Sequence, residues 1–436
     1  MSRRGLWLAL SGSCVYQVES IRELIRRRQL LLRRRPGLGV GRNVVLLGLT
    51  SLFTDLSAEM VAAILPLYLV YGLGLSPFQF GVVDGLYQGV TALVRVGGGM
   101  AGDRWRRHKE VAAFGYGVSA ACKLGYVAVG NALGSISGIV VADRLGKGIR
   151  TAPRDALISL SAAPRNLATA FGVHRALDTA GAMLGPLAAF AVLAAAPQSF
   201  DAVFVVSFCV ALIGLSILVM FVENPEAAGR EPTYFDKVSV RDALGLLATR
   251  RFQGLLVAGA PLALFTISDG FLYLAIQRHL DFDERFLPLL FTGTALAYMV
   301  LAVPVGRLAD RVGRARIFIG GYAVLLPVYA SLLVPAIGLA VIPFYLVLVG
   351  CYYAATDGVL MALASSLLPE RLRGSGLALL VTATSLSRLL ASVALGAIWT
   401  WIGLEAAVLS FGIGLLLAMS LAGVVLARVK EDPSHH

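Results

Sequence analysis

The chain has 436 residues, of which 57% are hydrophobic and only 15% are charged. About a quarter of the residues in soluble proteins are charged, so this composition excludes an ordinary soluble domain and indicates an integral membrane protein. The formal net charge of +12 lies mainly in an N-terminal tail and in short segments between apolar runs. That distribution argues against nucleic-acid binding and fits orientation in a membrane.

The N-terminal tail, residues 1–42, is strongly basic. It holds ten arginines and two glutamates. Its apolar residues Ile21, Leu24 and Ile25 stand beside arginine triplets, a pattern typical of an amphipathic helix that lies on anionic lipid. A disordered basic tail would have the same composition. Both interpretations predict a basic cytoplasmic tail.

The rest of the chain is a series of apolar runs of roughly 18 to 28 residues, each long enough to cross a hydrocarbon core of about 30 Å as a helix. We predict twelve, at 44–71, 78–100, 111–130, 133–152, 167–195, 200–222, 253–277, 286–308, 317–334, 337–360, 376–400 and 405–427. They form two six-helix halves, 43–222 and 252–427. A charged cytoplasmic linker, 223–251, joins the halves, and a short tail, 428–436, ends the chain.

Basic residues and a repeat support this organisation. Lys and Arg concentrate in every second connecting segment, whereas the other segments hold only Arg278 and Arg285, which predicts that both termini are cytoplasmic. Asp103-Arg104 follows the second run and Asp310-Arg311 follows the eighth, an offset of 310 − 103 = 207 residues. This offset predicts two homologous halves.

The most charged segment inside the apolar region is 143–155, with four basic and two acidic residues. Asp143, Arg144 and Lys147 fall near the middle of the fourth predicted span, and we assign them to substrate or proton handling. Arg150, Arg154 and Asp155 fall at the end of that span and just beyond it, at the predicted cytoplasmic mouth. We assign them to a conformational latch within reach of Asp103 and Arg104, with Gly148 and Pro153 separating the two groups.

Charges at membrane depth are costly, so each is a candidate for function. The first, fourth and fifth spans place six of them near the midplane: Asp55, Glu59, Arg144, Lys147, His174 and Asp178. We hypothesise that Asp55 or Glu59 exchanges a proton and that Arg144, Lys147 or His174 tunes its proton affinity by charge. Static buried ion pairs that hold the helices together are the alternative, and His174 is also explained as a hydrogen-bonded core residue.

Other charged residues within the spans rank lower. Asp84, Arg95 and Lys123 lie in the second and third spans, where long basic side chains can reach toward an interface. In the C-terminal half, Asp269, Asp357 and Arg388 are sparse and far apart in the sequence. We therefore expect proton coupling to reside in the N-terminal half.

Several motifs resemble the major facilitator superfamily. Residues 306–316, GRLADRVGRAR, resemble its loop signature G-x-L-x-D-R-x-G-R-[RK], and a first copy at 99–109 departs from it by having Arg106 in place of the second glycine. Arg144 to Gly148 resembles the fourth-helix R-x-x-x-G signature. Gly181, Gly185 and Pro186 resemble the fifth-helix signature of exporters, although the glycines that usually follow are replaced by Leu187-Ala188-Ala189.

The resemblance implies a fold of twelve transmembrane helices in two pseudo-symmetric halves. It implies latch roles for Asp103, Arg104, Asp310 and Arg311, and a helix hinge at Gly181, Gly185 and Pro186. Physically, paired Asp and Arg side chains at helix ends can hold two helices in one conformation and release them in another. A basic loop that only holds orientation, and glycines that only allow close packing, are the alternatives.

We therefore expect a monomeric secondary transporter of the cytoplasmic membrane that exports a small molecule by proton antiport and alternating access. Uptake by symport, metal-ion export through Asp55, Glu59 and His174, and a receptor or scaffold without transport are the alternatives. The sequence has no P-loop, G-x-S-x-G or H-E-x-x-H motif, so we expect neither an enzyme nor a cofactor. The four scattered cysteines predict neither a disulfide framework nor a metal site.

Overall fold

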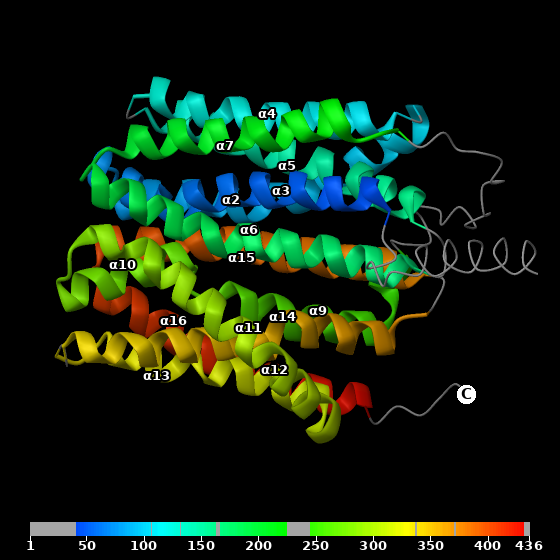
Figure 1. Cartoon of the computed structure of the whole chain (residues 1–436). Helices are drawn as coiled ribbons and strands as arrows, with labels where there is room; N and C mark the ends of the chain where they lie inside the picture. The colour runs from blue at the N-terminus through cyan, green and yellow to red at the C-terminus, as the bar shows by residue number, and fades with distance from the viewer. Residues whose placement is uncertain are drawn as a thin grey trace, which may run out of the picture.

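A computed structural model gives the fold (Figure 1). It describes residues 41–430 apart from 106, 131, 163–165, 225–244, 336–337 and 370–371, and leaves out the side chains of 92–105, 168, 429 and 430. Nearly all of the predicted tail 1–42, most of the linker 223–251 and residues 431–436 of the C-terminal tail lie outside the described residues. So do Arg106 and the side chains of Arg95, Asp103 and Arg104.

The N-terminal half consists of six long helices whose ends mostly fall within a few residues of the predicted spans. They are α2 (Arg42–Leu67), α3 (Pro77–Trp105), α4 (His108–Ala128), α5 (Leu133–Ser161), α6 (Leu167–Ala195) and α7 (Phe200–Phe221). A π-helical turn, η1 (Tyr68–Gly72), extends α2. The predicted end of the fourth span at residue 152 is wrong, because α5 continues through Pro153 to Ser161.

The C-terminal half has the same general plan with two interruptions. Its helices are α9 (Arg250–Leu264), α10 (Asp269–Leu280), α11 (Leu287–Val312), α12 (Arg314–Ala323), α13 (Leu325–Ser331), α14 (Ile342–Leu367), α15 (Arg373–Trp401) and α16 (Leu404–Lys430). Single turns of 3-10 helix are η3 (Leu246–Ala248), η4 (Glu284–Phe286) and η5 (Leu339–Val341). The seventh predicted span is thus two helices, separated at residues 265–268, and the ninth is divided at Val324.

Nine helical segments within the described residues are long and apolar enough to cross a membrane. At 29 residues each, α3 and α5 have the length but not the composition, since their polar and charged side chains lower the mean hydropathy. The divided α12 and α13 are also absent from the nine. The protein is therefore a multi-pass membrane protein, while the total of twelve crossings and the cytoplasmic position of the termini stay predictions.

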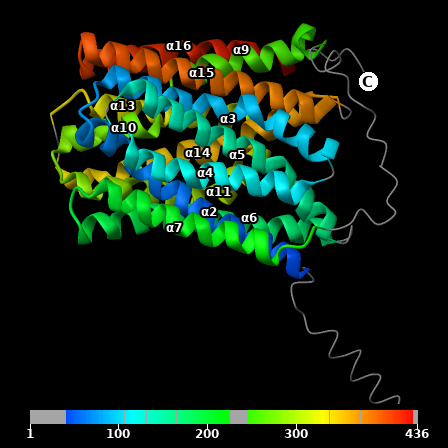
Figure 2. The ribbon, with the colours of Figure 1, turned by 90° about the horizontal axis from the view of Figure 1, so that it is seen from above.

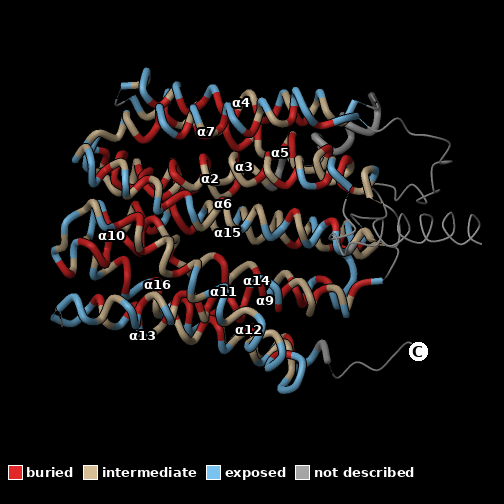
Figure 3. Tube along the Cα trace, viewed as in Figure 1, coloured by how far each residue is buried: buried red, intermediate tan, exposed pale blue. Residues whose placement is uncertain are grey.

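The two halves lie side by side with their helices along one common direction (Figures 1 and 2). Buried residues gather between the helices, whereas exposed ones follow the outer faces (Figure 3). Those outer faces are apolar: Val300 is 63% exposed and Leu417 is 67% exposed. Continuous apolar surface of this kind is expected where a protein contacts lipid.

Contact between the halves is strongest where α3 packs against α15. Glycine permits the approach, because a Cβ at Gly81 would stand 2.4 Å from the Ser392 carbonyl oxygen, and one at Gly85 would stand 2.8 Å from that of Leu389. At the same end of the bundle, Phe78 stacks on Trp401 with ring centroids 5.5 Å apart, and the Tyr71 hydroxyl donates to Gln277 Oε1 at 2.6 Å. This end, where α10 leads into α11, is therefore closed. We call it the closed end and the end at which α2 begins the basic end.

Candidate functional site

A cavity of about 270 Å³ lies between the two halves. From the N-terminal half it is lined by Glu59 on α2, by Asp84 and Tyr87 on α3, and by Arg144 and Lys147 on α5. From the C-terminal half it is lined by residues of α10, α14 and α15, including Asp269, Tyr352, Tyr353, Arg388 and Ser392. Charged groups of both signs thus face one space between the halves, where transporters of this architecture bind their solutes.

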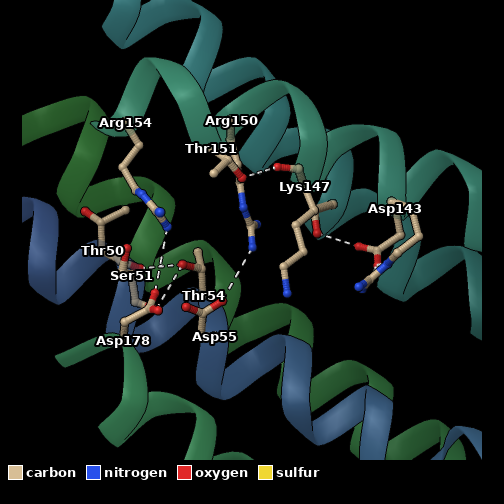
Figure 4. Close-up of polar contacts among 12 residues, drawn as sticks. Thr50, Ser51, Thr54, Asp55, Asp143, Lys147, Arg150, Thr151, Arg154 and Asp178 are labelled. Carbon is tan, nitrogen blue, oxygen red and sulfur yellow. Dashed lines mark hydrogen bonds and ion pairs between the residues drawn. The ribbon is translucent and has the colours of Figure 1, made fainter. Parts of the chain in front are cut away.

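The basic residues of segment 143–155 lie along α5 and face α2 and α6 (Figure 4). Arg150 Nη2 lies 3.7 Å from Asp55 Oδ1. Arg154 Nη1 lies 3.7 Å from Asp178 Oδ1, and its Nη2 donates to Asp155 at 2.9 Å. The helix is continuous through Gly148 and Pro153, and two arginines assigned to a latch pair with two carboxylates assigned to proton coupling. The functional division of this segment stays a prediction.

Asp55 and Asp178 form a carboxyl pair between α2 and α6. Their side chains lie within hydrogen-bonding distance of each other. The Oδ1 atom of Asp178 is buried and receives no hydrogen bond from a described donor, since 3.7 Å is too long for one from Arg154. A proton held between the two carboxyls would supply the missing donor, as happens when two carboxylates share one site.

A second charged cluster surrounds Asp143 deeper in the N-terminal half. Asp143 accepts hydrogen bonds from Ser119 Oγ and Arg144 Nη2, each at 2.5 Å, and lies 3.9 Å from Lys123 Nζ. The Arg144 guanidinium also lies over the Tyr87 ring, 3.8 Å from its centroid. Lys123 is only 3% exposed, so the expectation that it reaches toward an interface is wrong.

Two of the acidic residues ranked low in the sequence, Asp84 and Asp269, also line the cavity. Asp84 accepts a hydrogen bond from Ser392 Oγ of the other half at 2.6 Å, and Asp269 accepts one from Tyr353 at 2.7 Å. Arg388 lines the same cavity as Glu59 and Lys147. The charges of the C-terminal half are therefore not remote from those of the N-terminal half, and the site is shared.

The interruption between α9 and α10 borders this cavity and was not predicted. Thr266, Ile267 and Ser268 line it in non-helical conformation. Ser268 caps α10 by accepting a hydrogen bond from the Phe271 backbone N–H at 3.5 Å, and Asp269 lies in the first turn, where a negative charge suits the helix dipole. Serine followed by aspartate was the available signal for this helix start within an apolar run.

His174 and the predicted hinge lie along the contact between α6 and α2. His174 is 3% exposed, and its Nε2 forms a 2.8 Å hydrogen bond with Ser51 Oγ. A Cβ at Gly181 would stand 2.2 Å from the Leu52 carbonyl oxygen, and one at Gly185 would stand 2.7 Å from that of Leu56. Both glycines therefore permit close helix packing, while α6 continues through Pro186 without a break. A hinge at these residues stays a prediction.

The latch residues that the structure describes do not join the two halves. Asp310 accepts from Arg314 at 2.9 Å across the turn between α11 and α12, where Gly313 has a φ of +114°. Arg314 also donates to the Ala362 carbonyl of α14 at 3.3 Å. In the arrangement described here, this copy of the loop motif therefore links helices of its own half. The role of Arg311 and of the first copy stays a prediction.

The described residues contain no group of three His, Cys, Asp or Glu side chains arranged to hold a metal ion. Of the three residues considered for metal export, His174 is bonded to Ser51, Asp55 faces Arg150 and Glu59 lines the cavity.

Two packed helical halves around a charged central cavity define a membrane transporter. The family model of the Major Facilitator Superfamily matches residues 47–282 and 262–436. The chain belongs to this superfamily. An uncharacterized MFS-type transporter of Methanocaldococcus jannaschii is 30% identical over 376 residues, which cover 83% of this chain and 89% of the relative.

Solved structures show the same fold at low sequence identity. The nucleoside transporter NupG aligns with a TM-score of 0.70 and 14% identity over 89% of this chain and 99% of its own. The peptide transporter POT, in a mutant form, aligns with a TM-score of 0.71 and 16% identity over 89% and 95%. A bacterial homolog of the human lysosomal transporter Spinster aligns with a TM-score of 0.69 over 90% and 98%.

Proposed function

We propose that this transporter moves a small molecule through the central cavity by alternating access and couples the movement to protons, with export by antiport as the expected direction. The observation that carries proton coupling is the contact between the Asp55 and Asp178 carboxyls, in which a buried oxygen lacks a donor. Protonation of one carboxyl would join α2 to α6 directly. Loss of the proton would leave two negative charges facing Arg150 and Arg154 on α5.

Such a change links proton binding to helix packing. With both carboxyls charged, α2 and α6 repel each other locally and each is drawn toward α5. With one carboxyl neutral, the attraction toward α5 weakens. A proton therefore biases the arrangement of α2, α5 and α6, of which α2 and α5 line the cavity, and a coupling site has to produce a bias of this kind.

Closure at the end between α10 and α11 supports alternating access. Hydrogen bonds and ring contacts between the halves gather there in the described residues, as with Tyr71 and Gln277 or Phe78 and Trp401. If the basic end faces the cytoplasm, as the positive-inside rule predicts, then this conformation is closed toward the outside. Rocking of the halves would separate these contacts and open the cavity on that face.

Uptake by symport is the second candidate, and Lys147 favours it. Lys147 attracts Glu59 electrostatically without forming an ion pair with it, and both residues line the cavity. A proton on Glu59 would remove a negative charge that repels an anionic solute near Lys147, so that proton and solute would bind together. Competition between a proton and a solute for one carboxylate would instead give antiport.

Proteoliposomes separate these possibilities through the sign of the gradient. Antiport predicts that solute accumulates in vesicles with an acidic lumen, whereas symport predicts accumulation when the exterior is acidic. A panel of charged and neutral small organic molecules serves as the solutes. If accumulation did not depend on the pH gradient for any transported molecule, proton coupling would be refuted. The variant Asp201→Asn, at an exposed position of the closed end, serves as the control for loss of a carboxylate.

A further inference from the structure

Three charged side chains that line the cavity have no hydrogen bond or ion pair within the described part of the chain. They are Glu59, Lys147 and Arg388. The Arg388 Nε atom is buried without an acceptor, and Asp357, which attracts Arg388 electrostatically, lies beyond ion-pair distance. Figure 4 shows the Lys147 side chain extending from α5 toward α2. All three side chains are half-buried. Charged groups at membrane depth are normally paired, so these three need an explanation.

The remaining charges of the cavity already have partners. Asp84 is bonded to Ser392 and Asp269 to Tyr353. Arg144 is held by Asp143 at 2.5 Å and by the Tyr87 ring. The charged groups left without a hydrogen-bond or ion-pair partner among the described residues are thus one carboxylate and two cations. A carboxylate or phosphate group of a ligand would supply the acceptors that Lys147 and Arg388 lack.

The rest of the lining limits the size and character of such an anion. A volume of about 270 Å³ lies near the lower limit for ligand pockets. Phe80, Phe291 and Tyr352 contribute rings to the wall, and aromatic faces favour an apolar or aromatic body. Lys147 belongs to the N-terminal half and Arg388 to the C-terminal half, so a ligand between them would contact both halves.

We propose that the cavity binds a small organic anion whose carboxylate or phosphate group lies between Lys147 and Arg388. If the protein is the transporter proposed above, this anion belongs to its solute class. The binding of the anion to the cavity does not depend on that function. A bridging anion would form an ion pair with Lys147 in the N-terminal half and with Arg388 in the C-terminal half. It therefore stabilises the conformation in which the two cations approach each other.

Thermal unfolding of the full-length protein in detergent tests the charge of the ligand. The probes share a benzene ring and differ in their polar group: benzoate, phenyl phosphate, neutral benzamide and cationic benzylamine. Benzoate or phenyl phosphate should raise the unfolding temperature in a saturable way, and the stronger of the two identifies the anionic group. Benzamide and benzylamine should have little effect. The inference would be refuted if only benzylamine stabilised the protein, or if neither benzoate nor phenyl phosphate did.

Two variants locate the anion. Lys147→Met and Arg388→Gln should each weaken binding of the stabilising anion by about tenfold to a hundredfold, the usual effect of removing a charged hydrogen-bond partner. Lys109→Met removes a lysine that donates to the Val219 carbonyl at the surface and should leave binding unchanged. Equal affinity in wild type, Lys147→Met and Arg388→Gln would contradict the proposed position.

Folding of the variants is checked by the same measurement without ligand. Lys147 is half-buried and forms no ion pair that its removal would break, so Lys147→Met should unfold at the wild-type temperature or above it. Binding needs no pH gradient. Anion binding without proton-driven flux would therefore refute proton coupling and leave the inference of an anion site standing. Proton-driven flux of cations only would support proton coupling and refute the anion site.

Discussion

Ser392 on α15 donates a 2.6 Å hydrogen bond to Asp84 on α3, and this bond crosses from one half of the transporter to the other beside the cavity. Both side chains are buried, with 2% exposure for Ser392 and 8% for Asp84. A hydrogen bond to a charged group contributes roughly 1.5–3 kcal/mol. The bond forms only while the halves meet at this seam, so it favours the conformation that is sealed at the closed end.

Replacing Ser392 with alanine should therefore shift the population toward conformations open at that end, by about tenfold or more. Spin labels at Gly130→Cys and Leu333→Cys, one in each half at the closed end, report the separation of the halves once the four native cysteines are replaced. We expect a larger fraction of long distances in Ser392→Ala. Ser410→Ala is the matched control, because Ser410 donates only to Ala407 of its own helix. An unchanged distance distribution would show that the bond does not bias the conformation.

Gly181 should tolerate no side chain. Its Cβ would meet the Leu52 carbonyl oxygen at 2.2 Å, so Gly181→Ala should cost about 1–3 kcal/mol through overpacking of α6 against α2. Gly138 on α5 has open space around it, so Gly138→Ala should be neutral or stabilising by about 0.5–1 kcal/mol through helix propensity. Unfolding temperatures in detergent compare the two. Similar values for both variants would mean that α2 and α6 are less tightly packed than described.

Arg144 and Lys147 lie one turn apart on α5 but should respond differently to loss of charge. Arg144→Met leaves Asp143 in a buried site without its 2.5 Å partner, which costs about 3–5 kcal/mol for a broken buried pair. Asp143→Asn added to Arg144→Met should recover only part of that loss, because it removes the Asp143 charge but also takes the carboxylate away from Lys123, which lies 3.9 Å from it. Lys147→Met is the matched control on the same helix and should cause no loss. If Arg144→Met were as stable as Lys147→Met, the pairing of Arg144 with Asp143 would be energetically unimportant.

The apolar runs predicted most helices, because lipid-facing helices have to be apolar along most of their length. The end of α5 was missed for a physical reason: Arg150, Arg154 and Asp155 are typical of a loop when read alone. Their partners Asp55 and Asp178 lie about 95 and 24 residues away along the chain, at positions read from the sequence, and only packing of three helices brings them together. Charged residues continue a buried helix when another helix supplies the opposite charge.

For the candidate site, too, the sequence alone did not show which residues far apart along the chain lie together. The sequence identified Glu59, Arg144 and Lys147, which do line the cavity, because isolated charges in apolar runs are conspicuous. Asp269 and Arg388 were ranked low, since distance along the chain says little about distance across the boundary between two halves. The non-helical residues 265–268 were hidden in an apolar run whose length suited a continuous span.

The central claim, proton coupling through the carboxyl pair of Asp55 and Asp178, is tested most directly by comparing two fluxes of one transported solute in proteoliposomes. One flux is exchange without a gradient, and the other is accumulation driven by a pH gradient. In the double variant Asp55→Asn, Asp178→Asn, which cannot exchange a proton at this pair, we predict that exchange continues while gradient-driven accumulation is lost. The same separation of the two fluxes in Glu59→Gln alone would place the proton on Glu59. Undiminished accumulation in the double variant would contradict the account.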